Sequence, residues 1–194
     1  MMRMRKLIKI TVSLLLTAGL FACQSTPDNN GDKTRESSSQ TSNLTVNQAD
    51  TTTFVSYSSD AVMGEALYVP VYSHIYQRDQ KRTFNLTTTL SFRNKDLKRP
   101  VTLKKVYYYD SKGNLVEKYL DGKRRVQPLA SVSYVIEESD LRGGVGANFL
   151  VLWESSQQVS DPVVETVMIS TSGQQGISFL SEGRIIHSLR KSGQ

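Results

Sequence analysis

Cysteine is almost absent from this chain, since its 194 residues contain only Cys23. A disulfide within the chain is therefore impossible, and a zinc site built from several thiolates is excluded. Histidine is scarce too: His74 and His187 are the only two, so a three-histidine metal site cannot form. We expect neither a metal nor another cofactor. Long apolar runs are also missing, because the apolar stretch at residues 10–22 is shorter than the roughly 20 residues of a membrane-spanning helix.

Acidic residues are missing from the first 23 positions, which do contain four cations: Arg3, Arg5, Lys6 and Lys9. A basic region, an apolar region of about a dozen residues and a small residue before the cleavage site are typical of a secretory signal. Residues 20–23, Leu-Phe-Ala-Cys, resemble the bacterial lipobox, in which the cysteine becomes the mature N-terminus and carries lipid. We therefore predict a lipoprotein signal peptide at residues 1–22 and lipid attachment, including palmitate, at Cys23. The alternative is a free thiol that only ends the signal.

The predicted lipid makes a membrane the first expected partner. Each buried acyl CH₂ contributes about 0.8 kcal/mol, and two or three acyl chains anchor a protein firmly. Gln24 follows the cysteine in place of the Asp that resembles an inner-membrane retention signal. We expect a bacterial cell-envelope location, at the outer membrane facing the periplasm if the source is Gram-negative.

The charge of the chain gives little support for nucleic-acid binding. The formal net charge is +6, but four of the 24 basic residues and none of the 18 acidic residues precede Cys23. The rest of the chain has 20 basic and 18 acidic residues, a net charge of +2. We therefore expect no nucleic-acid partner.

Residues 23–61 contain mainly Ser, Thr, Asn, Gln and Asp, with too few apolar residues to fold alone. We predict a flexible tether between the lipid and a folded domain at residues 62–190.

From Leu67 onward, apolar residues recur at every second position, which predicts strands. The alternation is complete in Phe84–Arg93, as in an antiparallel strand with one buried face. It shifts by one residue near Lys104 and Lys105, which predicts a β-bulge. Polar turns about every dozen residues separate about seven such segments, and no helix is evident before the final turns. We predict an all-β fold, an immunoglobulin-like antiparallel β-sandwich of about seven strands.

Residues 148–154 are apolar on both faces, which predicts a central strand whose outer side is covered. We expect apolar residues of the C-terminal tail to cover it: Ile177, Phe179, Leu180, Ile185 and Ile186.

Leu67–Tyr76 is predicted to form one strand with an aromatic face: Tyr68, Tyr72, His74 and Tyr76. Exposed tyrosines provide apolar area together with a hydroxyl, so this row is a candidate binding face for glycan or peptide. The alternative is that the tether or a neighbouring strand packs over it.

Catalytic motifs are absent from the sequence. The glycine-rich residues 141–148 lack the end of a phosphate loop and lead into a strand, so their glycines are expected to allow positive φ in a tight turn. Glu137, Glu138 and Asp140 are interpreted as a solvated loop entry. No Gly-x-Ser-x-Gly elbow occurs, and we assign no catalytic residue.

Several segments together resemble a bacterial envelope lipoprotein domain family, catalogued as domain of unknown function 3124: residues 68–76, 82–87, 108–110, 143–153 and 175–179. The resemblance spans about residues 65–182 and implies a single exported domain, often lipid-anchored. It implies no catalytic residues and no ligand.

The favoured hypothesis is a non-enzymatic, lipid-anchored β-sandwich that binds or scaffolds an envelope protein or glycan. The alternative is a hydrolase of cell-wall or surface polymers, which a deep pocket with two convergent titratable groups would favour. A third hypothesis is an assembly factor that lends a sheet edge to client strands.

Overall fold

The structure is a computed structural model that describes residues 53–173 and 175–191. Within this part of the chain no helix is long and apolar enough to cross a membrane. The same residues form eleven strands and one 3₁₀ turn: β1 (Met63–Val71), β2 (His74–Gln77), β3 (Asp79–Asn85), β4 (Thr87–Arg93), β5 (Val101–Tyr109), β6 (Leu115–Val126), β7 (Ser131–Ile136), η1 (Gly144–Gly146), β8 (Ala147–Ser155), β9 (Val163–Ser170), β10 (Ile177–Glu182) and β11 (Arg184–Arg190).

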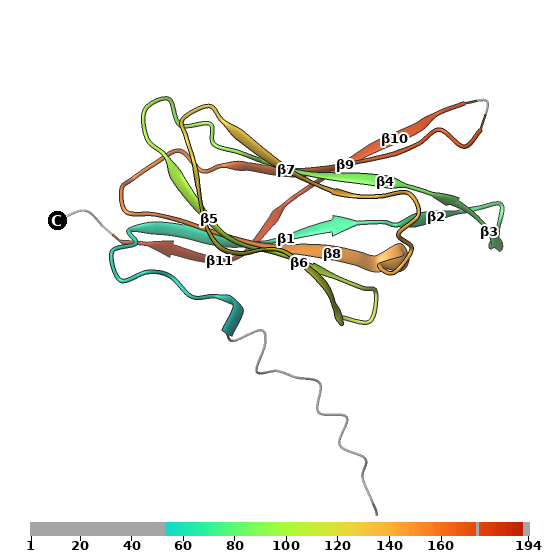
Figure 1. Cartoon of the computed structure of the whole chain (residues 1–194), viewed down its shortest axis with the longest axis horizontal. Coiled ribbons are helices and arrows are strands. Elements are labelled where there is room, and N and C mark those ends of the chain that lie inside the picture. Colours follow the sequence, from blue (N-terminus) through green and yellow to red (C-terminus); the bar gives the residue numbers. More distant parts are fainter. Residues whose placement is uncertain (1–52, 174, 192–194) are drawn as a thin grey trace, which may run out of the picture. The chain divides into compact units, whose positions relative to one another are not determined.

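Two antiparallel sheets face each other (Figure 1). One sheet has five strands in the order β11-β1-β8-β5-β6, and the other has four in the order β10-β9-β4-β7. The short β2–β3 hairpin lies at the same end of the sandwich as the turn between β9 and β10. The prediction of an all-β antiparallel sandwich is confirmed.

The main core lies between the sheets because alternate residues of each strand point inward. In β4, Thr88, Leu90 and Phe92 are buried, whereas Thr87, Thr89 and Ser91 lie on the other face and are half-buried. The predicted β-bulge is confirmed, since the register of β5 shifts between Leu103 and Lys105 against both neighbouring strands.

The predicted number of strands was too low, partly because two segments that alternate continuously are each broken in the structure. Residues 67–76 divide into β1 and β2 at Tyr72 and Ser73, and residues 84–93 divide into β3 and β4 at Leu86. At the first break, buried Ser73 leaves the ladder and binds η1: its amide donates to the carbonyl oxygen of Gly144 at 3.0 Å. Its hydroxyl accepts the amide of Gly144 at 2.8 Å. A serine that forms hydrogen bonds with backbone groups outside the sheet does not change the hydrophobic periodicity, so the break could not be predicted from it.

The central strand is β8, as predicted, but the segment that covers its outer face was assigned incorrectly. Leu150 and Leu152 pack against Phe54, which is 2% exposed, and against partly buried Val55 and Tyr57. The segment before β1 therefore covers the outer face of the five-stranded sheet.

This result also corrects the boundary of the predicted tether, because residues 53–61 belong to the domain. The Nζ of Lys105 donates to the carbonyl oxygens of Thr53 and Phe54 at 2.9 and 3.0 Å. The Nζ of Lys104 donates to the carbonyl oxygen of Ser56 at 2.6 Å. The polar composition of residues 53–61 gave no sign that they belong to the domain. Lysines bind their carbonyl groups, and only a few of their apolar side chains are buried. The tether residues before 53 lie outside the described residues.

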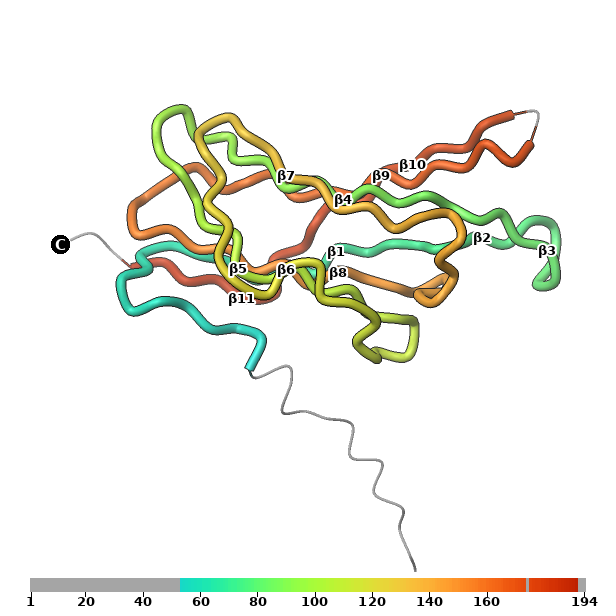
Figure 2. The backbone as a smooth tube through the Cα atoms, in the orientation of Figure 1, coloured from blue at the N-terminus to red at the C-terminus, as the bar shows by residue number. Residues whose placement is uncertain are grey.

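The C-terminal tail forms an edge strand in each sheet in place of the predicted cover. Residues 177–190 cross from one sheet to the other at Gly183 (Figure 2). A Cβ at Gly183 would lie 3.1 Å from the carbonyl oxygen of Val164, so the crossing is too close for a larger residue without adjustment. Leu180, Ile185 and Ile186 remain exposed because β10 and β11 lie at the sheet edges. The crossing joins the two sheets at this side of the sandwich.

Candidate functional site

A polar pocket lies on the side of the sandwich opposite the crossing, where β6 and β7 are the edge strands of the two sheets. We call this side the open side. The volume of the pocket is about 490 Å³, within the range of small-molecule sites. Its lining comes from β6, β7 and the loop after β7: Glu117, Tyr119, Val135, Glu137, Ser139, Asp140, Leu141 and Arg142.

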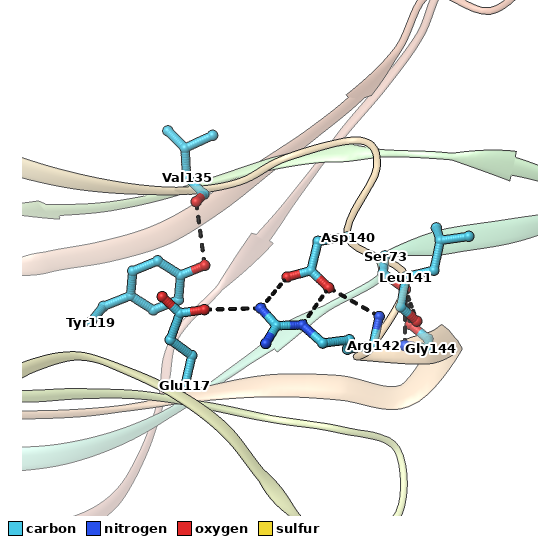
Figure 3. A network of polar contacts seen from close by, with 8 residues as sticks. All are labelled: Ser73, Glu117, Tyr119, Val135, Asp140, Leu141, Arg142 and Gly144. Carbon is cyan, nitrogen blue, oxygen red and sulfur yellow. Dashed lines mark hydrogen bonds and ion pairs between the residues drawn. The ribbon is translucent and has the colours of Figure 1, made fainter.

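Arg142 is the centre of the polar network in the pocket (Figure 3). Its Nε and one terminal nitrogen donate to the two carboxylate oxygens of Asp140 at 2.9 and 2.7 Å. The same terminal nitrogen donates to Glu117 of β6 at 2.9 Å. A planar guanidinium holds carboxylates in this paired geometry, so Arg142 fixes the loop after β7 to the edge of the other sheet.

Tyr119 joins the two sheets beside this network. Its hydroxyl donates to the carbonyl oxygen of Val135 in β7 at 3.3 Å, and its ring packs edge-on against Tyr134 and Phe149. Burial, followed by the negative charge of Glu117, raises the pKa of Tyr119 to about 12. The hydroxyl is therefore neutral and remains a hydrogen-bond donor at physiological pH.

The loop after β7 requires glycine at two positions. Gly144 has φ +78°, a left-handed conformation that favours glycine, which confirms the expectation for this stretch. Gly143 has an ordinary helical conformation, but a Cβ there would lie 1.8 Å from the hydroxyl oxygen of Tyr108. Glycine is therefore required at position 143 because the loop backbone lies so close to the side chain of Tyr108.

Serines attach the same loop to the rest of the domain. The hydroxyl of Ser111 donates to the carbonyl oxygen of Gly143 and accepts the amide of Gly146, both at 2.8 Å. The hydroxyl of Ser73, which lies between β1 and β2, accepts the amide of Gly144. Residues 143–146, which directly follow Arg142, are thus held by hydrogen bonds to Ser73 and Ser111.

The electrostatics of the pocket keep the carboxyl group of Asp140 ionised. Hydrogen bonds from Arg142 hold the pKa of Asp140 below its ordinary value, although burial opposes this shift. The pKa of Arg142 is raised in turn by its bonds to Asp140 and Glu117. A glycosidase general acid needs a raised carboxyl pKa, which is the opposite of the shift at Asp140. The carboxylates of Glu117 and Asp140 do converge in the pocket, but both are bound by the guanidinium of Arg142.

Two buried glutamates elsewhere have structural partners. Glu154 accepts hydrogen bonds from the amide and hydroxyl of Ser58 at 2.8 and 2.6 Å and pairs with Lys104 at 2.9 Å. Burial opposes its ionisation, but these bonds outweigh burial and lower its pKa. Glu65 binds Trp153 and Arg190, and burial raises its pKa. Glu65 does not line the polar pocket at the open side.

The structure does not place the predicted aromatic row on one strand. Tyr68 lies in β1 and packs against the Phe54 cluster, whereas Tyr72 lies after β1 with its ring 5.9 Å from Phe179. His74 and Tyr76 lie in β2, with ring centroids 6.0 Å apart, and Tyr76 is 52% exposed. Tyr68 thus follows the alternative of packing under the preceding segment. A binding role for the other three stays a prediction, and Cys23 lies outside the described residues.

Sequence reasoning missed Glu117, Tyr119 and Arg142 as site residues. Asp140 and Arg142 stand close together before a glycine-rich run, which is a local signal for a structured loop. Their link to Glu117, 25 residues away from Arg142, depends on the stacking of two sheet edges and has no local signal.

The fold and the pocket define an all-β sandwich domain with a polar site at its open side. Residues 64–186 match the family described as "Protein of unknown function (DUF3124)". Because this match covers more than half of the chain, the chain belongs to that family, which confirms the sequence resemblance to domain of unknown function 3124. No curated protein and no solved structure matches the chain.

Proposed function

We propose that this protein is a lipid-anchored envelope protein whose domain binds an uncharged, hydroxyl-rich ligand, such as a cell-wall glycan, in the pocket at the open side. The lipid anchor rests on the basic and apolar residues before Cys23. The observation that carries the binding role is the network of Arg142, Asp140 and Glu117 beside the ring of Tyr119.

The chemistry of the lining selects against anionic ligands, because an anion would meet the carboxylates of Glu117, Glu137 and Asp140. Two of these carboxylates are already paired with the guanidinium of Arg142, which leaves both acceptors and donors for a neutral ligand. Ligand hydroxyls both donate and accept, so they can bind carboxylate oxygens and guanidinium N–H groups together. Tyr119 adds an apolar surface with a hydroxyl, a combination suited to a sugar ring.

Titration followed by ¹⁵N–¹H NMR tests this proposal, using the chain that begins at Gln24 and a soluble oligomer of N-acetylglucosamine as the probe. We expect saturable shifts at residues 117–119 and 137–143, with a dissociation constant of about 0.1–1 mM, corresponding to about 4–5.5 kcal/mol of binding free energy. Arg142→Gln should weaken binding at least about tenfold, a loss of about 1.4 kcal/mol. Because the side chain of Arg142 is 57% exposed, we expect Arg142→Gln to fold as the wild type does.

Tyr76→Ala is the matched control, because it removes the exposed aromatic residue of the other candidate face. Binding that survives Arg142→Gln but not Tyr76→Ala would move the site to β2 and refute the pocket. Shortened oligomer in the NMR sample would show the hydrolase alternative.

A further inference from the structure

Exposed cations gather at the end of the sandwich that is remote from the pocket. The strand registers place Arg93, Val101, Val126 and Arg190 at this end. Two elements there carry exposed basic side chains, the β4–β5 loop and the last residues of β6: Lys95, Lys98, Arg99, Lys123, Arg124 and Arg125. We call these six residues and their two elements the basic end.

The two most exposed large apolar side chains of the described domain also lie here. Leu97, in the β4–β5 loop, is 74% exposed, and Leu129, in the β6–β7 loop, is 69% exposed. Each is more exposed than any other large apolar residue of residues 53–173 and 175–191. Leucines that project from loops among cations have little role in the core, and they suit a surface that offers both negative charge and an apolar interior.

Buried Asn94 holds the two leucine-bearing loops together. Its side-chain amide donates to the carbonyl oxygens of Arg99 at 2.9 Å and of Val126 and Gln127 at 3.1 Å. Its backbone amide donates to the carbonyl oxygen of Ala130 at 3.0 Å. Leu97 and Leu129 are therefore presented from one cross-linked pair of loops.

The backbone of Leu129 adds an independent observation. Its φ is +59°, in the left-handed region that costs a residue with a Cβ roughly 1–2 kcal/mol. Glycine or asparagine would fit this turn with less strain. A strained leucine that is also exposed contributes neither to the turn nor to the core, which points to a contact outside the domain.

The carboxylates of three acidic residues at this end have partners in the structure. Glu165 pairs with Arg93, and Asp161 pairs with Arg190. Asp96 accepts the amides of Lys98, Arg99 and Ser160 at 2.8, 2.8 and 2.9 Å. Asp96 is the one acidic residue within the two elements of the basic end, against six basic residues, so the net charge of the basic end is positive.

We propose that the basic end docks on an anionic phospholipid bilayer, with Leu97 and Leu129 inserted at the level of the headgroups and the six cations over the lipid phosphates. This goes beyond the proposed function, because it assigns a second surface and an orientation. The pocket, which lies at the open side toward the other end of the strands, is then held away from the membrane surface. Neither ligand binding nor lipidation of Cys23 is needed for the contact to form.

Vesicle flotation of the unlipidated chain that begins at Gln24 tests the proposal. Vesicles of phosphatidylcholine alone are compared with vesicles that contain about 30% phosphatidylglycerol, at about 0.1 and 0.5 M NaCl. We expect binding to the anionic vesicles only, with a partition coefficient that falls at least about tenfold at the higher salt. Lys95→Glu with Lys98→Glu should lower it by a similar factor.

The leucines are tested by Leu97→Ser with Leu129→Ser, which should weaken binding to anionic vesicles about tenfold or more. The matched control is Leu115→Ser with Ile169→Ser, two exposed apolar residues toward the other end of the strands, and it should bind as the wild type does. Lys81→Glu with Lys112→Glu is the control for charge. Anionic-vesicle binding that the leucine pair leaves unchanged, or that both control pairs weaken equally, would overturn the proposal. So would equal binding to the neutral vesicles or no binding at all.

Discussion

Gly143 is the position where the smallest change should have the largest effect on the pocket. The Cβ of Gly143→Ala would lie 1.8 Å from the hydroxyl oxygen, 2.6 Å from Cζ of Tyr108 and 2.8 Å from the Cβ of Ala147. The backbone at Gly143, with φ −72° and ψ −38°, is well suited to alanine, so the whole effect comes from steric overlap.

The surrounding side chains allow Tyr108 little room to move. Tyr108 is fully buried, its ring lies 5.2 Å from that of Phe149, and Tyr119 packs beside both. Overpacking in a filled core costs about 1–3 kcal/mol, and this overlap belongs at the upper end of that range. About 3 kcal/mol corresponds to a fall in Tm of roughly 10 °C for a domain of this size.

Urea and thermal unfolding of Gly143→Ala measure this effect, with Gly146→Ala as the matched control. A Cβ at Gly146 meets only Ser111, at 3.4 Å or more, so this variant should unfold much as the wild type does. The double variant Gly143→Ala with Tyr108→Phe should regain part of the loss, since the nearest clashing atom is removed. Equal stability of Gly143→Ala and the wild type would refute the described approach of the loop to Tyr108.

Three further predictions concern the rest of the domain. Phe54→Ala should lower the free energy of unfolding by about 3 kcal/mol and open residues 53–61 to limited proteolysis; an unchanged digestion pattern would place this segment outside the domain. Glu154→Gln leaves Lys104 unpaired and should cost about 3 kcal/mol at neutral pH. Because the pKa of Glu154 is held below its usual 4.5, its contribution is present above that pH and is lost as pH falls through the folded value, so urea unfolding of variant and wild type should converge in acid. Leu129→Gly should raise Tm through relief of about 1 kcal/mol of strain, and a lower Tm would contradict the positive φ.

Periodicity predicted the parts of the fold in which one strand alternates without interruption. The residues of β4 and β8, and the bulge in β5, were found correctly because burial on one or both faces determines their side-chain pattern. The breaks at Ser73 and Leu86 were not predicted. The chain keeps its alternation of apolar and polar residues across each break, although its backbone hydrogen bonds pass to a different partner strand.

The outer cover of β8 was assigned to the wrong end of the chain for a related reason. Ile185 and Ile186 are apolar, yet they lie in an edge strand and remain exposed. Phe54 is one aromatic residue in a polar stretch, and Lys105 of β5 binds the carbonyl oxygens of Thr53 and Phe54. Composition alone cannot show such long-range contacts.

The pocket could be predicted only in fragments. The positive φ of Gly144 follows from local turn chemistry, whereas the meeting of Glu117, Tyr119 and Arg142 follows from which strands end at the sheet edges. Strand order is a property of the whole chain, and no spacing in the sequence encodes it.

The most direct test of an anchored envelope protein is the intact mass of the chain extracted from its native membranes. We predict a chain that starts at Cys23 and carries a diacylglyceryl group on its sulfur, with or without a third acyl chain on its amino group. A chain that keeps residues 1–22, or one that starts at Cys23 without lipid, would contradict it.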